Sequence, residues 1–120
     1  MSKSESYLVL YPDGSYRNLV CERSQLLYEF QDAIGCEIFE LVRTEYGFMM
    51  AVDESGVISG RQQINPYASC FYAGAAAGSF IFGPVIFCCE GFVDGEPDIV
   101  PVPPLLLARI KLCIEGCEKF

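Results

Sequence analysis

The sequence contains no histidine, and only eight of its 120 residues are lysine or arginine. Without histidine, the side chain that most often transfers protons in active sites is missing, and zinc sites that combine cysteine with histidine are excluded. The eight basic residues are scattered along the chain and stand against 16 acidic residues, so the net charge is −8. Because a groove for duplex DNA needs clustered basic residues, we expect no binding to duplex nucleic acid.

Long apolar runs are also missing. The longest, FIFGPVIFCC, has about half the length that a membrane-spanning helix needs and is interrupted by Gly83-Pro84, so a buried strand is the better interpretation and no membrane contact is expected. The N-terminus carries no apolar signal region, and the seven cysteines show no Cys-x-x-Cys spacing. We therefore expect reduced thiols in a cytoplasm, with no metal and no cofactor.

The length and composition predict one globular domain. With 52% hydrophobic residues, the chain is expected to fold as a single domain over residues 1–120, with residues 1–5 disordered. Pro12-Asp13-Gly14 lies between two apolar runs. Because proline fixes φ and glycine accepts a positive φ, this turn predicts a β-hairpin over residues 6–22.

Two longer helices are predicted. The first covers residues 24–35, with Ser24 as its N-cap and Gly35 at its C-terminal end. Its apolar face is expected to contain Leu26, Leu27, Phe30 and Ile34. The second covers residues 104–120, with a stripe of Leu106, Ile110, Cys113 and Cys117 that is widened by Leu105, Ala108 and Leu112. Such an apolar helix either packs on the sheet or forms a homodimer through residues 105–117.

Strands are predicted at residues 36–44, 47–60 and 80–93. The second of these is expected to be a hairpin around Asp53-Glu54-Ser55-Gly56, and the third is expected to turn at Gly91. The proline-rich residues 94–104 are predicted to be a connection, because proline disfavours the interior of a sheet. Since strands and helices do not alternate regularly, the predicted fold class is α+β: a mostly antiparallel sheet of hairpins with two or three helices packed on one face.

The candidate binding segment surrounds Asn65-Pro66. Asparagine is a preferred N-cap and proline a preferred first helical residue, so a short helix is predicted to follow and to end at Gly74. Asn65 is then a structural cap, or the helix start offers N–H groups to a carboxylate or phosphate. Under the second interpretation, the residues that would bind a small anionic ligand are Arg61, Asn65, Tyr67, Ser69 and Tyr72.

No catalytic residue is predicted. The carboxylates, among them Glu37, Glu40, Asp53 and Glu54, are expected on solvated strand and turn faces. A nucleophilic cysteine such as Cys70 would need a partner that lowers its pKa, and that partner is usually histidine. A non-enzymatic protein is therefore expected.

Residues 6–93 resemble a known family. The turn Asp53-Glu54-Ser55-Gly56, the segment Asn65-Pro66-Tyr67-Ala68 and the strand start Gly83-Pro84-Val85 are similar to the pattern of the domain of unknown function 3846 family. This resemblance implies a setting in phages and mobile elements of bacteria and brings no catalytic residues with it.

Three hypotheses about function follow. The first is a binding protein of phage or mobile-element type that counters host defence, by sequestering a small nucleotide signal or by blocking a host protein with its acidic surface. The second is an interaction module that dimerises through its C-terminal helix. The third is a small carboxylate-dependent nucleotide hydrolase. The first is preferred because few groups suited to catalysis are present.

Overall fold

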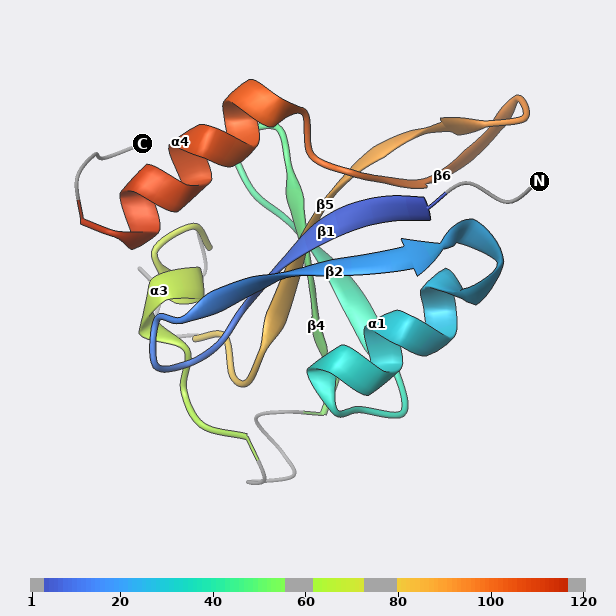
Figure 1. Ribbon diagram of the computed structural model, residues 1–120. Coiled ribbons are helices and arrows are strands. Elements are labelled where there is room, and N and C mark those ends of the chain that lie inside the picture. The colour runs from blue at the N-terminus through green and yellow to red at the C-terminus, as the bar shows by residue number, and fades with distance from the viewer. Residues whose placement is uncertain (1–3, 56–61, 73–79, 117–120) are drawn as a thin grey trace.

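The computed structural model describes residues 4–55, 62–72 and 80–116. These residues form a six-stranded antiparallel sheet with helices beside it, so the predicted α+β class is confirmed (Figure 1). Its strands are β1 (Ser4–Leu10), β2 (Tyr16–Glu22), β3 (Phe39–Arg43), β4 (Met49–Asp53), β5 (Val85–Val93) and β6 (Glu96–Val100). Five of them follow the order β2-β1-β5-β4-β3, and β6 pairs with the second half of β5. The helices are η1 (Arg23–Gln25), α1 (Leu26–Ile34), α3 (Pro66–Ser69) and α4 (Pro104–Ile114).

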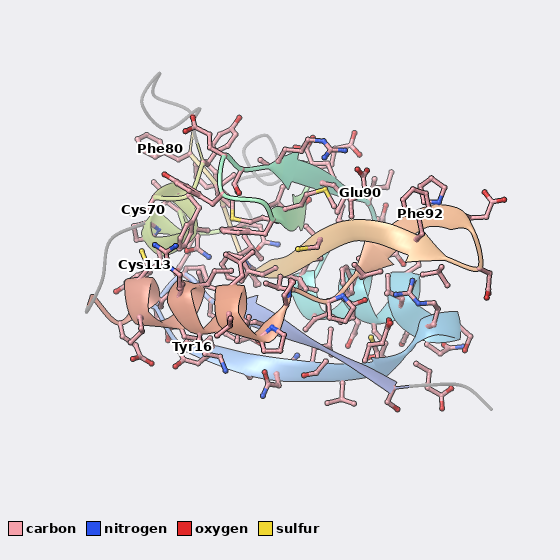
Figure 2. All side chains as sticks on the ribbon, turned by 90° about the horizontal axis from the view of Figure 1, so that it is seen from above. Tyr16, Cys70, Phe80, Glu90, Phe92 and Cys113 are labelled. Atoms are coloured by element: carbon pink, nitrogen blue, oxygen red, sulfur yellow. The ribbon has the colours of Figure 1, made fainter. Side chains whose placement is uncertain are left out.

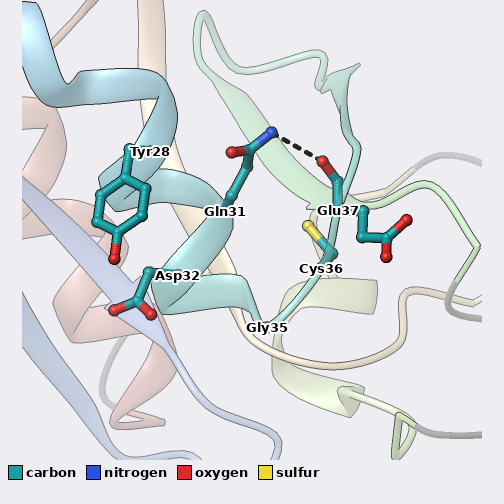
Figure 3. A pocket seen from close by; sticks show the side chains of 6 residues that line it. All are labelled: Tyr28, Gln31, Asp32, Gly35, Cys36 and Glu37. Carbon is teal, nitrogen blue, oxygen red and sulfur yellow. Dashed lines mark hydrogen bonds between the residues drawn. The ribbon is translucent and has the colours of Figure 1, made fainter.

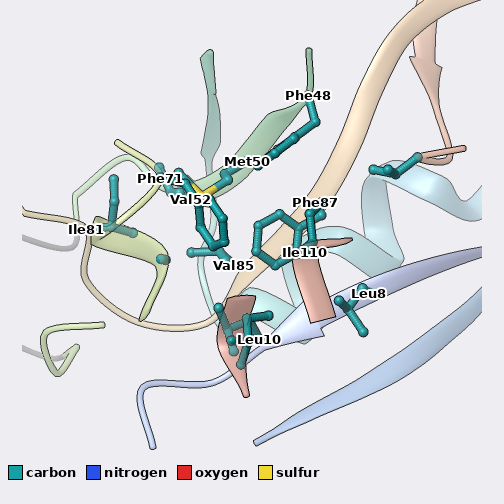
Figure 4. Packing of buried hydrophobic residues seen from close by; sticks show 13 residues of the cluster. Leu8, Leu10, Phe48, Met50, Val52, Phe71, Ile81, Val85, Phe87 and Ile110 are labelled. Carbon is teal, nitrogen blue, oxygen red and sulfur yellow. The ribbon is translucent and has the colours of Figure 1, made fainter. Parts of the chain in front are cut away.

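Helices cover both faces of the sheet, so the expectation that they pack on one face is wrong. Leu8 and Leu10 of β1 belong to one apolar cluster, which also contains Ile110 of α4 (Figure 4). Tyr7 and Val9, which alternate with them along the strand, belong to a second cluster that contains Phe30 of α1. Every residue of β4 is buried, so this central strand is apolar on both sides. Because both of its faces are apolar, both faces of the sheet have to be covered.

The first hairpin and α1 form largely as predicted. β1 and β2 pair from Ser4↔Glu22 to Leu10↔Tyr16, and Gly35 ends α1 in the left-handed conformation at φ 78°. Ser24 does not cap α1, because it lies inside η1, which precedes the helix. Leu27 is 62% exposed and does not belong to the buried face, which consists of Leu26, Phe30 and Ile34.

Two predictions about chain segments need correction. Ser4 and Glu5, expected to be disordered, belong to β1, where Glu5 forms an ion pair with Arg23 at 2.6 Å. Residues 96–100, expected within a connection, form β6, and the chain turns at Asp94 and Gly95 instead of Gly91. Proline has no backbone N–H group, so one hydrogen-bond donor of β6 is missing. β6 is nevertheless paired with β5 over its whole length, from Glu96 opposite Val93 to Val100 opposite Cys89.

α4 packs on the sheet through the predicted stripe of Leu106, Ile110 and Cys113, but the residues predicted to widen it, Leu105, Ala108 and Leu112, are exposed. Ile110 and Ile114 are buried, and Leu106, Leu107 and Cys113 pack partly against the same cluster. Leu105, which was expected to widen the stripe, is 85% exposed. Tyr16 of β2 lies beside α4, where its hydroxyl donates to the Glu115 carboxylate and its ring lies 6.0 Å from the Lys111 ammonium (Figure 2). The predicted second arm of the 47–60 hairpin, the residues GAAAG and Cys117 lie outside the described residues.

Candidate functional site

Asn65 and Ser69 of the predicted ligand site are internal structural residues. Asn65 is fully buried; its Oδ1 accepts from the Ala68 amide at 3.0 Å, and its Nδ2 donates to the carbonyls of Leu10 and Gly83 at 3.3 and 2.9 Å. Ser69 Oγ donates to the Asn65 carbonyl and accepts from the Ile81 amide. The polar atoms of both side chains are therefore occupied by the protein backbone, and the interpretation of Asn65 as a cap is confirmed.

The other predicted ligand residues are not gathered into one site by the described structure. The ring of Tyr67 lies over the β1–β2 turn, so close that a Cβ atom at Gly14 would lie 2.7 Å from its Cζ. Tyr72 packs partly against the core cluster beneath α4, and Arg61 lies outside the described residues. Since α3 has only four residues, its start offers little of the anion-binding field of a longer helix.

A hollow of about 540 Å³ lies at the C-terminal end of α1, and we call it the α1 hollow (Figure 3). It is lined by Tyr28, Gln31, Asp32, Gly35, Cys36 and Glu37. Tyr28 and Asp32 come from neighbouring turns of α1, and the left-handed Gly35 redirects the chain so that Glu37 reaches the opposite wall. The Gln31 side chain links the two sides of the hollow by donating to the Glu37 carbonyl at 2.7 Å (Figure 3).

The α1 hollow is negatively polarised. The C-terminal end of a helix carries a partial negative charge, which basic residues in the last turn usually compensate. The last turn of α1 has no basic residue and instead carries Asp32, while Glu37 lies on the other side with its carboxylate directed away from Tyr28 and Asp32 (Figure 3). Among the described residues, no lysine or arginine lines the hollow. Helix end and side chains thus act together to favour a positively charged group.

Cys36 is a neutral thiol in this setting. Burial, together with the carboxylate of Asp53, raises its pKa to about 11. At neutral pH the thiol is therefore protonated. It is a weakly polar group in the wall of the hollow and not a nucleophilic thiolate. The Asp53 carboxylate is held by the side chain of Gln62, which donates to it and to the Ile34 carbonyl, both at 3.2 Å, and so ties the end of β4 to the end of α1.

A second, smaller hollow of about 230 Å³ lies at the same end of β4, on the face of the sheet that α4 covers. Its lining combines acidic, aromatic and aliphatic side chains: Glu40, Val42, Val52, Asp53, Glu54, Tyr72, Phe80, Ile81 and Phe82. Within the described residues, no group of three or more cysteine, aspartate or glutamate side chains is arranged to hold a metal ion. These residues also include no helix that is long and apolar enough to cross a membrane.

The sequence prediction missed the α1 hollow although a signal for it was present. Asp32 and Glu37 flank Gly35, the residue predicted to end the helix. Acidic residues on both sides of a helix C-terminus oppose the helix dipole, and such local conflicts are concentrated at functional sites. Glu37 was instead predicted to be one of many solvated carboxylates.

Comparisons with known proteins bear on the fold alone. No family model and no curated protein matches the sequence. The chain is similar to part of a solved structure described as the crystal structure of small RNA methyltransferase HEN1, with a TM-score of 0.59 and 12% sequence identity. The similarity covers 95% of this chain and 16% of that one. At this identity it supports the arrangement of strands and helices and says nothing about activity.

Proposed function

We propose that this protein is a non-enzymatic binding protein that blocks a host protein by binding a basic segment of it in the α1 hollow. The observation that carries the proposal is the presence of two acidic residues, Asp32 and Glu37, around a helix C-terminus whose last turn contains no basic residue. A lysine or arginine side chain there would meet the Asp32 carboxylate and the carbonyls at the helix end, with Tyr28 on the same side and the Glu37 charge nearby.

The net charge of −8 supports the same class of partner, since an acidic surface attracts basic proteins and speeds their association. The resemblance to the domain of unknown function 3846 family supplies the setting: a phage or mobile-element protein that counters host defence in the bacterial cytoplasm.

Between the two modes of action considered for such a protein, blocking a host protein agrees better with the described residues than sequestering an anionic nucleotide. Asn65 and Ser69, central to the anion site, are engaged by the backbone.

Capture from a bacterial lysate tests the proposal. Immobilised wild-type protein is compared with the double variant Asp32→Asn/Glu37→Gln and with the matched control Asp94→Asn/Glu96→Gln, which removes the same charge at the exposed β5–β6 turn. The proposal predicts a captured host protein with a basic segment that the hollow variant loses and the control keeps. Equal capture by all three proteins, or a nucleotide that remains bound in native mass spectra, would contradict it.

A further inference from the structure

We infer that the partner's basic segment binds in an extended conformation and adds as a strand along β3, with alternating basic and apolar side chains. This inference rests on the proposed function and specifies how its site is used. The surface in question, which we call the β3 edge, is the side of Phe39–Arg43 that faces away from β4.

β3 is a terminal strand of the sheet order and pairs with β4 through five consecutive residue pairs, from Phe39↔Asp53 to Arg43↔Met49. Among the described strands, none pairs with its other side. β3 contains no proline, glycine or bulge, which are the features that commonly protect an exposed strand from further pairing. Its one basic residue, Arg43, is bound to Glu90 at 2.9 Å. With respect to the described residues, the β3 edge therefore retains the backbone groups and the regular geometry that strand addition uses.

The β3 edge continues directly from the α1 hollow. Glu37 lines the hollow, Ile38 is the next residue, and β3 begins at Phe39. The Ile38 carbonyl accepts from the Glu54 amide at 3.2 Å, so the sheet geometry extends almost to the wall of the hollow. A single extended segment could thus run along β3 and continue past Phe39, where a residue outside the paired strand would place one cationic side chain in the hollow.

The side chains of β3 define the sequence pattern that would fit. Successive side chains of a strand point to opposite faces, and cross-strand neighbours lie on the same face. On one face, Glu40 lies with Glu54 at the acidic second hollow. On the other, Leu41 is 41% exposed and lies near Met49 and Ile99. An added strand would therefore present a basic residue beside Glu40 and an apolar residue beside Leu41.

The other end of the sheet does not offer the same complementarity. β2 is the second terminal strand, and its exposed residues include Arg17 together with Glu22. A basic segment would meet a like charge there, and like charges on neighbouring strands are unfavourable. β3 also carries an arginine, but Arg43 is paired with Glu90, whereas Arg17 donates to the neutral Tyr11 hydroxyl. Between these two terminal strands, the charge pattern therefore favours the β3 edge for a basic strand.

Short fluorescent peptides test the inference by fluorescence anisotropy. The probe is a peptide of alternating arginine and valine with blocked ends; one comparator has the same composition with all arginines before all valines, and another is the probe with alternate backbone amides methylated. We expect each change to weaken binding by about tenfold, because scrambling misplaces the side chains and methylation removes several backbone hydrogen bonds. Hydrogen exchange should slow at the amides of Phe39–Arg43 that do not pair with β4.

The matched variants are Glu40→Lys on β3 and Glu22→Lys on β2, which make the same charge reversal at the two ends of the sheet. The first should weaken binding of the probe by about tenfold, and the second should change it little. If methylated and unmodified peptides bind equally, or if β3 amides gain no protection, strand addition is refuted. In that case, loss of binding in Asp32→Asn/Glu37→Gln would still support the hollow, so the two proposals fail separately.

Discussion

Replacing Asn65 with aspartate separates a structural role of this residue from a binding role. The carboxylate retains an oxygen that can accept from the Ala68 amide and thus cap α3. It lacks the Nδ2 group that donates to the carbonyls of Leu10 and Gly83, and a second carboxylate oxygen would face these two carbonyls instead. Since Asn65 is fully buried, water cannot replace the missing donor.

The magnitude follows from these contacts. Loss of a helix N-cap costs about 1 kcal/mol, and leaving buried carbonyls without a donor costs about 1–3 kcal/mol. Asn65→Ala loses both contributions, so we expect the free energy of unfolding to fall by about 2–4 kcal/mol. Asn65→Asp keeps the cap but adds repulsion between oxygens in a buried site, so at neutral pH it should destabilise at least as much as the alanine variant.

Urea unfolding at pH 7, followed by circular dichroism, measures these differences. The matched control is Gln63→Glu, the same amide-to-carboxylate change on an exposed neighbouring side chain, which should shift stability by less than about 0.5 kcal/mol. If Asn65→Asp unfolds at the same urea concentration as the wild-type protein, the assignment of Nδ2 as a structural donor is refuted.

Three further predictions concern stability. Gly14→Ala should destabilise the protein by about 1–3 kcal/mol in thermal unfolding, because Gly14 has φ 90° and the Cβ of an alanine at this position would collide with Tyr67. Unchanged stability would refute that contact. Ile110→Ala should cost about 2–5 kcal/mol in urea, whereas Leu105→Ala, on the exposed side of α4, should cost less than about 0.5 kcal/mol; equal losses would refute the assigned packing. Burial and Glu5 raise the pKa of Tyr7, so the neutral phenol is favoured in the folded state and the free energy of unfolding should fall as pH rises above about 10. Tyr7→Phe should make this pH dependence weaker, and an unchanged slope would contradict the prediction.

Local signals predicted those parts of the fold that depend on a few neighbouring residues. Pro12-Asp13-Gly14 identified the first hairpin, and Gly35 identified the end of α1, because positive φ at a turn or helix end strongly favours glycine. Asn65-Pro66 likewise identified the start of α3. These features need no knowledge of which elements pack together.

Features that depend on distant contacts were predicted less well. Pro97 favoured a connection over a strand at β6, because proline has no backbone N–H group to donate. The pairing of this segment with Cys89–Val93 stabilises the strand in spite of that one missing donor. Leu8 and Leu10 alternate with Tyr7 and Val9 along β1, and this pattern indicates that both faces of the sheet are apolar. It does not indicate which helix covers each face.

The predicted binding residues had a similar weakness. A preferred cap and a preferred anion-binding residue share the same residue types, so the sequence left both interpretations of Asn65 open. Burial and the bonds to Leu10 and Gly83, residues distant in the sequence, resolve the question. The α1 hollow was missed because its walls meet only once Gly35 has turned the chain and placed Glu37 opposite Tyr28.

The most direct test of the central claim, that the α1 hollow takes a cationic group, is an NMR titration of the isotopically labelled protein at constant ionic strength. Nα-acetyl-arginine amide and adenosine monophosphate are added in separate experiments. The account predicts that the arginine derivative shifts amide signals of residues 31–37, that Asp32→Asn/Glu37→Gln removes these shifts, and that the nucleotide leaves them unchanged. Shifts caused by the nucleotide at residues 65–72, with none from the arginine derivative at 31–37, would contradict it and favour sequestration of an anionic ligand.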